Sequence, residues 1–75
     1  MKKRHTHAIV YRGAPYGLDE GGELVSTHPS EGAALAEMGR LQRSPRYRGN
    51  VSVVDLDETS HLFGGTAREF FRIPV

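Results

Sequence analysis

The chain has 75 residues, a net charge of +1 at pH 7 and no cysteine. A chain of this length forms one domain, residues 1–75, because domains typically contain on the order of 100–150 residues and rarely divide below that size. The lack of cysteine excludes disulfide bonds, thiolate zinc sites and cysteine nucleophiles. The near-neutral charge gives no overall attraction to nucleic acid or to a membrane surface.

The N-terminal residues do not predict a signal peptide. Residues 1–4 are basic, but polar residues 5–7 stand where an apolar run of roughly 7–15 residues would have to begin. The longest apolar run, residues 8–11, is far shorter than the ~20 residues that span a bilayer. We therefore expect a cytoplasmic protein without membrane contact, in which residues 1–4 form a disordered basic terminus.

The first part of the chain predicts two strands joined by a loop. Residues 5–12 roughly alternate polar and apolar side chains and include Ile9, Val10 and Tyr11, which favour extended structure. Residues 13–22 are rich in glycine and proline, a composition typical of a loop. Residues 23–27 form the second predicted strand.

One helix is predicted after the second strand. Its expected N-cap is Thr27 or His28, and Pro29 lies near its first turn. The helix should end before Pro45, because the residue that precedes a proline is disfavoured in the α conformation. The apolar residues of one helix face recur at spacings of three and four: Leu35, Met38 and Leu41.

Two further strands are predicted after the helix. Residues 51–56, with three valines, form the clearest strand in the chain. Residues 57–66 have no clear assignment, and residues 68–73 are predicted as the last strand, with Pro74 confining its end to a sheet edge. The order β-β-α-β-β favours a small α+β domain with a mainly antiparallel sheet and one helix packed on one face.

The predicted strands carry more apolar residues than one helix can cover, because strand side chains alternate between the two faces of a sheet. The second face should therefore be an exposed apolar surface, typical of an interaction site or a homodimer interface. The alternative is that loop side chains cover it. The side chains available for that are Tyr16, Leu18, Leu62 and Phe63.

The densest charge lies in residues 40–48, the arginine-rich segment, which has four arginines and no acidic residue. Guanidinium groups bind carboxylates and phosphates, and a tyrosine ring can stack on a base. Arg40 and Arg43 fall in the last turn of the predicted helix, where the helix dipole alone favours a cation. Arg46, Tyr47 and Arg48 have no such explanation. All five are candidate partner- or nucleic-acid-binding residues.

The histidines and aspartates form weaker patterns. His5 and His7 share one strand face at i, i+2 spacing, but two histidines without a third fixed ligand make a weak metal site. Asp55 and Asp57 share a face in the same way, and aspartates commonly start turns. The sequence contains no P-loop, dinucleotide or nucleophile-elbow motif. We expect no cofactor, metal or catalytic residue; a small hydrolase or nuclease built on these four residues is the remaining enzymatic alternative.

Residues 24–36 read Leu-Val-Ser-Thr-His-Pro-Ser-Glu-Gly-Ala-Ala-Leu-Ala. This stretch, followed by a strand, resembles a strand–cap–helix pattern of small phage and plasmid proteins, among them phage inhibitors of host enzymes. The resemblance implies a small inhibitor or adaptor of phage or plasmid origin. Together with the missing catalytic motifs, it favours a non-enzymatic protein-binding module that inhibits or regulates a larger protein. The alternative is a nucleic-acid-binding module that uses the arginine-rich segment.

Overall fold

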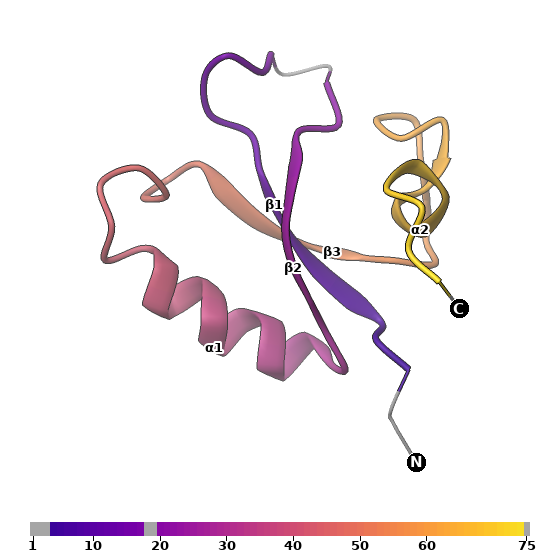
Figure 1. Cartoon of the computed structure of the whole chain (residues 1–75), viewed down its shortest axis with the longest axis horizontal. Helices are drawn as coiled ribbons and strands as arrows, with labels where there is room; N and C mark the ends of the chain where they lie inside the picture. The colour runs from indigo at the N-terminus through magenta and orange to yellow at the C-terminus, as the bar shows by residue number, and fades with distance from the viewer. Residues whose placement is uncertain (1–3, 18–19, 75) are drawn as a thin grey trace.

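The computed structural model describes residues 4–17 and 20–74. Its main sheet has three antiparallel strands in the order β2-β1-β3, and helix α1 (Glu31–Leu41) packs on one face (Figure 1). The chain is therefore a small α+β domain, as the sequence predicts. The strands of this sheet are β1 (His7–Tyr11), β2 (Glu23–His28) and β3 (Val51–Asp55).

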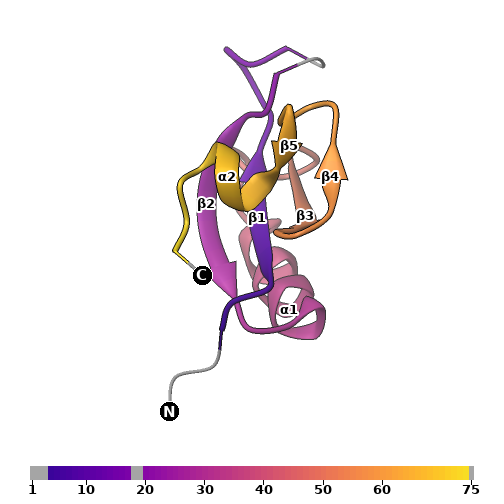
Figure 2. The same ribbon diagram turned by 90° about the vertical axis from the view of Figure 1, so that its right-hand side faces the viewer.

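A second, smaller unit follows β3. The strands β4 (Thr59–Ser60) and β5 (Gly65–Thr66) pair with each other but with no strand of the main sheet. The short helix α2 (Ala67–Phe70) comes directly after β5. Figure 2 shows α2 in front of the main sheet, on the side opposite α1. The sheet therefore has a layer on each face.

Strand β1 is the centre of the fold. Ala8, Ile9 and Val10 are fully buried, because β1 has a neighbouring strand on both edges and a layer on both faces. Ala8 belongs to the same buried cluster as Ala67, so it faces α2. Ile9 is the next residue along the strand and therefore faces α1.

Helix α1 begins later than the sequence predicts. Strand β2 continues through Thr27 to His28, so these two residues are not the N-cap. The cap is Ser30, whose hydroxyl oxygen accepts a hydrogen bond from the Ala33 N–H at 3.1 Å. Threonine and serine are both good caps, and only the length of the preceding strand decides between them. The predicted end of the helix before Pro45 is confirmed.

The prediction of a last strand over residues 68–73 is wrong, because α2 and a turn occupy this segment. The helix begins at a capping box: the Thr66 hydroxyl accepts from the Glu69 N–H at 3.2 Å, and the Glu69 carboxylate accepts from the Thr66 N–H at 3.1 Å. This reciprocal pair satisfies two N–H groups that a helix start leaves without partners. It outweighs the strand preference of the two phenylalanines that follow.

The structure supports the alternative in which other parts of the chain cover the second face of the sheet. Ala8, Leu56 and Ala67 form a buried cluster, so this face is not an open apolar surface for a homodimer. Tyr16 packs instead against Tyr11, and Leu18 lies outside the described residues. Partly buried side chains from β2, from β3 and from the residues after β3 pack against the cluster: Leu24, Val54, Phe63, Phe71 and Ile73.

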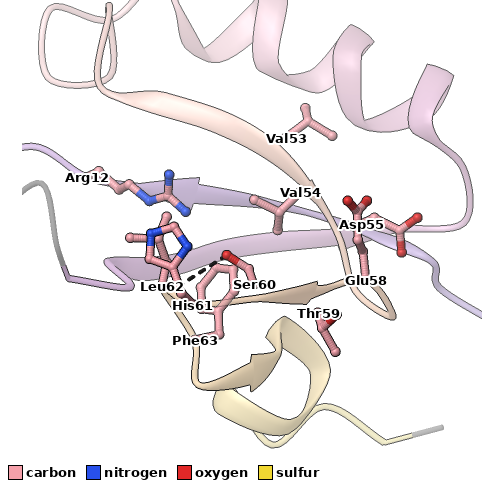
Figure 3. Close-up of a pocket in the computed structure, with 10 residues that line it drawn as sticks. All are labelled: Arg12, Val53, Val54, Asp55, Glu58, Thr59, Ser60, His61, Leu62 and Phe63. Atoms are coloured by element: carbon pink, nitrogen blue, oxygen red, sulfur yellow. Dashed lines mark hydrogen bonds between the residues drawn. The ribbon is translucent and has the colours of Figure 1, made fainter.

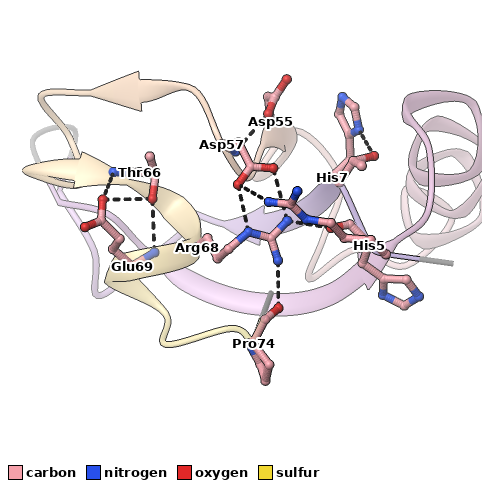
Figure 4. A network of polar contacts seen from close by, with 10 residues as sticks. His5, His7, Asp55, Asp57, Thr66, Arg68, Glu69 and Pro74 are labelled. Atoms are coloured by element: carbon pink, nitrogen blue, oxygen red, sulfur yellow. Dashed lines mark hydrogen bonds and ion pairs between the residues drawn. The ribbon is translucent and has the colours of Figure 1, made fainter. Parts of the chain in front are cut away.

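Arg68 fastens the C-terminal part to the sheet (Figure 4). Its side chain is only 7% exposed, and its Nε and Nη2 donate to the two carboxylate oxygens of Asp57 at 2.8 and 3.1 Å. It also donates to the carbonyl oxygens of Pro74 at 2.8 Å and His5 at 2.6 Å. Arg4 donates to the same Asp57 at 3.0 Å, so Arg4 is held in place; the rest of the predicted basic terminus lies outside the described residues.

Candidate functional site

The arginine-rich segment begins in the last turn of α1 and continues as a series of turns that lead back to β3. Two of its arginines are held by groups of α1. Arg40 forms an ion pair with Glu37 on the same helix, and the hydrogen bond from Arg40 lowers the pKa of Glu37. The Arg48 Nε donates to the carbonyl oxygen of Gln42, the C-cap of the helix, at 3.2 Å. Both arginines therefore have structural partners.

Arg46 and Tyr47 pack against Tyr11 at the end of β1. The guanidinium carbon of Arg46 lies 5.3 Å from the ring centre of Tyr11 and 5.4 Å from that of Tyr47. The two rings meet edge to face with centroids 5.8 Å apart. The Arg46 Nη2 also lies 3.9 Å from the Glu23 carboxylate. These contacts supply the structural explanation that the sequence lacks, and they occupy part of the Tyr47 ring that would stack on a base.

Arg43 differs from the other predicted site residues. Its side chain is exposed and makes no hydrogen bond or ion pair with residues 4–17 or 20–74. The structure thus gathers the five predicted residues at one end of α1. Of their four arginines, only Arg43 has no hydrogen-bond or ion-pair partner within the described chain.

Of the histidine and aspartate candidates, the structure places His7 opposite Asp55 in the β1–β3 ladder. The His5 Nδ1 lies 2.6 Å from the Thr27 hydroxyl, and the His7 Nδ1 lies 2.8 Å from the Thr6 hydroxyl. The carboxylate of Asp57 is paired with two arginines, and the hydrogen bond from Arg68 is the main cause of its lowered pKa. Within residues 4–17 and 20–74, no group of three or more histidine, aspartate or glutamate side chains could hold a metal ion.

A cleft of about 450 Å³, the β3 cleft, lies between β3 and residues 58–63 (Figure 3). Val53 and Val54 both line it, although consecutive strand residues point to opposite faces of a sheet. The cleft therefore reaches the edge of the strand. It also extends over the face of the sheet that carries Ala8, because Arg12 and Phe63 line it as well. Its other lining residues are Arg12, Asp55 and the six residues from Glu58 to Phe63.

Two backbone hydrogen bonds define how β3 pairs with β1. The Arg12 N–H donates to the Asn50 carbonyl at 2.7 Å, just beyond one end of the ladder. The Leu56 N–H donates to the Thr6 carbonyl at 2.9 Å, just beyond the other end. In an antiparallel pair, hydrogen-bonded and non-hydrogen-bonded residue pairs alternate. Both flanking bonds involve even-numbered residues, so the even-numbered residues of β3 bond to β1.

The odd-numbered residues of β3 therefore present their backbone groups to the outside. Ser52 and Val54 are opposite Val10 and Ala8 and bond to them, whereas Val51, Val53 and Asp55 direct their N–H and C=O groups away from β1. In the described part of the chain no other strand pairs with β3, and no further backbone hydrogen bond reaches these three residues. Two of these residues, Val53 and Asp55, line the β3 cleft.

Charged side chains of opposite sign stand at the two ends of the β3 cleft. Arg12 lies at the Val51 end, and its guanidinium is 5.8 Å from the ring centre of Phe63. Its Nε is buried and has no hydrogen-bond partner among residues 4–17 and 20–74. Asp55 and Glu58 lie at the other end, and both are exposed (Figure 3). The site can therefore donate and accept backbone hydrogen bonds along β3. Its two ends favour ligand groups of opposite charge.

Sequence reasoning missed the β3 cleft. The valines predict the strand, but only the spatial order β2-β1-β3 places that strand at an edge.

In the described part of the chain, no helix is long and apolar enough to span a membrane. Comparison with known proteins gives no match to a family model, to a curated protein or to a solved structure.

Proposed function

We propose that the chain is a non-enzymatic protein-binding module that inhibits or regulates a larger protein, and that it contacts this protein along β3. The observation that supports this proposal is the row of unpaired backbone groups at Val51, Val53 and Asp55, next to an open cleft. An unpaired strand edge is a template for a strand of another chain. Addition of a partner strand to such an edge is a recurring mode of protein recognition.

The two edges of the sheet differ in a way that favours β3 as the contact. On the β2 side, the register with β1 shifts between Ile9 and Val10, which is a bulge or irregularity. Bulges at an edge hinder pairing with another chain. Strand β3 pairs with β1 without such a shift, and it contains neither lysine nor proline. Two common forms of edge protection, a lysine and a proline, are therefore absent from β3.

The nucleic-acid alternative has less support. Arg40 and Arg46 face carboxylates, and Tyr47 packs on Tyr11. Arg43 and Arg48 remain as phosphate contacts, and two such contacts give a log–log salt slope of only about −1.8 on duplex DNA. We therefore expect weak, salt-sensitive DNA binding at most.

The experiment that tests the proposed function is affinity capture from a native lysate with the whole chain as bait. The Val53→Pro variant removes one outward N–H and leaves the hydrogen bonds to β1 intact. The control variant carries Arg43→Glu and Arg48→Glu. We expect capture of one specific protein that survives nuclease treatment, is lost with Val53→Pro and is retained by the control. Capture that nuclease or the control variant abolishes would contradict the proposal.

A further inference from the structure

We infer that the β3 cleft takes an extended segment of the partner protein, with an aspartate or glutamate next to Arg12 and a basic residue next to Asp55 and Glu58. The inference rests on the proposed function and adds the conformation and the charge order of the bound segment. Both come from the backbone edge and from the two charged ends of the cleft.

The conformation follows from the spacing of the unused backbone groups. Val51, Val53 and Asp55 offer an N–H and a C=O at every second residue, which is the spacing that an extended chain matches. The volume of about 450 Å³ falls in the range of about 300–1,000 Å³ that is typical of ligand sites. A helix would not match this edge, since its own backbone groups are already paired.

Arg12 specifies an acidic side chain at one end. Its side chain makes no hydrogen bond or ion pair with residues 4–17 or 20–74. Because its Nε is buried, a ligand would have to bind the two Nη groups. The ring of Phe63 lies against the guanidinium and limits its movement. A carboxylate is the acceptor that fits a guanidinium best, because it takes two parallel hydrogen bonds from it.

Asp55 and Glu58 specify a cation at the other end. Both carboxylates are exposed, and neither takes part in an ion pair with residues 4–17 or 20–74. The Asp55 carboxylate accepts one backbone hydrogen bond, from the Asp57 N–H at 2.9 Å. Exposed charges contribute modestly to affinity, so this end mainly sets the orientation of the bound segment.

The wall opposite β3 favours a single segment over a second copy of this chain. Residues 58–63 line the cleft across from the strand edge, and Figure 2 shows β4 on the side of β3 that faces away from β1. A second copy that paired through its own β3 would bring a second wall of this kind into the same space. A single extended segment has no such obstacle.

The test uses the whole chain, labelled with ¹⁵N, and synthetic peptides with acetylated and amidated ends. The probe alternates valine and threonine, with aspartate at one end and lysine at the other, and is made in both sequence directions. We expect one direction to bind and to shift the amide signals of Val51, Val53 and Asp55. Replacing the aspartate of the probe by asparagine should weaken binding roughly tenfold, because one charged hydrogen-bonding group is lost. A further probe has a free C-terminal carboxylate in place of the aspartate side chain. If it binds better than the aspartate probe, the choice of an acidic side chain is overturned.

Two variants keep the result independent of overall stability. Arg12→Gln should bind the aspartate and asparagine probes equally, and Glu58→Gln should retain the full preference for aspartate. The inference is overturned if no probe binds, if the shifts fall in the arginine-rich segment, or if light scattering shows a β3-dependent dimer instead. Loss of lysate capture in Val53→Pro would then still support the proposed function, so the two failures are distinguishable.

Discussion

Arg68 and the arginine-rich segment carry the same kind of charge in opposite surroundings. Arg68 is isolated in the sequence, yet its side chain is 7% exposed and donates to groups on three separate parts of the chain. The segment is dense in arginine, yet the side chains of Arg40 and Arg46 are 66% and 62% exposed. In this chain the dense run of arginines therefore lies on the surface, whereas the buried arginine that links distant parts of the chain is isolated in the sequence.

The two kinds of arginine differ in how well water can replace their contacts when the side chain is removed. The Arg68 side chain is itself buried, so water replaces its hydrogen bonds to Asp57, His5 and Pro74 poorly. The side chains of Arg40 and Arg46 are exposed, so water competes with their ion pairs to Glu37 and Glu23. A chain of this length buries only about 60% of its unfolded surface, so it has little stability to lose.

The largest expected effect comes from Arg68→Met, which keeps the length of the side chain and removes its donors. We expect a loss of about 2 kcal/mol in the free energy of unfolding, since hydrogen bonds from a charged group to several acceptors disappear. Chemical denaturation followed by circular dichroism measures it. The matched control is Arg43→Met, which should change stability by less than about 0.5 kcal/mol. Equal losses in the two variants would remove the distinction between the two regions.

Thr66→Ala should have the next largest effect, because it deletes one half of the capping box of α2. The expected loss is about 1 kcal/mol. Ser30→Ala is the matched variant for α1, whose N-cap is a single hydrogen bond. Thr66→Ala should also speed amide hydrogen exchange in residues 67–74 more than in β1. Uniform acceleration across the chain would show that α2 does not open separately.

Arg72→Gly should stabilise the protein. Arg72 has φ 55°, in the left-handed region that glycine adopts without steric cost. It follows α2 where the Ile73 N–H bonds to the Arg68 carbonyl at 2.9 Å and the Arg72 N–H to the Glu69 carbonyl at 3.2 Å, a Schellman ending that favours glycine. We expect a gain of about 0.5–1 kcal/mol, read from the denaturation midpoint. A loss of stability would mean that the Arg72 side chain has a structural role.

The smallest effect is a dependence of stability on acid pH. The hydrogen bond from Arg68 lowers the pKa of Asp57 in the folded state. This contribution is complete above the unfolded pKa of about 3.9 and disappears as the pH falls through the lower folded value. Stability should therefore drop below about pH 4, and Arg68→Met should flatten the drop. Glu37→Gln removes the other carboxylate with a lowered pKa and serves as the control.

The sequence predicted what depends on local pattern. The strand at the valines of β3 and a helix that ends before Pro45 were both predicted from local pattern. The predicted apolar face of α1 is only partly right, because Leu35 is 47% exposed. The start of α2 also has a local signal that was missed, since threonine followed three residues later by glutamate is a capping-box pattern. The strand preference of Phe70 and Phe71 concealed it.

Features that depend on distant contacts could not be predicted. Arg68 bonds to residues that are 11 and 63 positions away in the chain, and nothing near it in sequence indicates burial. The position of β3 at an edge depends on how three strands are ordered in space. The β3 cleft and the Arg68 network were therefore both missed, although every residue involved is visible in the sequence.

Amide hydrogen exchange at β3 tests the central claim most directly, because the proposed contact requires an edge that is free in the unbound protein. We predict that the Val54 N–H, which bonds to β1, exchanges slowly. The Val53 N–H, which points away from β1, should exchange much faster in the same sample. Equal, strong protection of both amides would show that the edge is already occupied and would contradict the account.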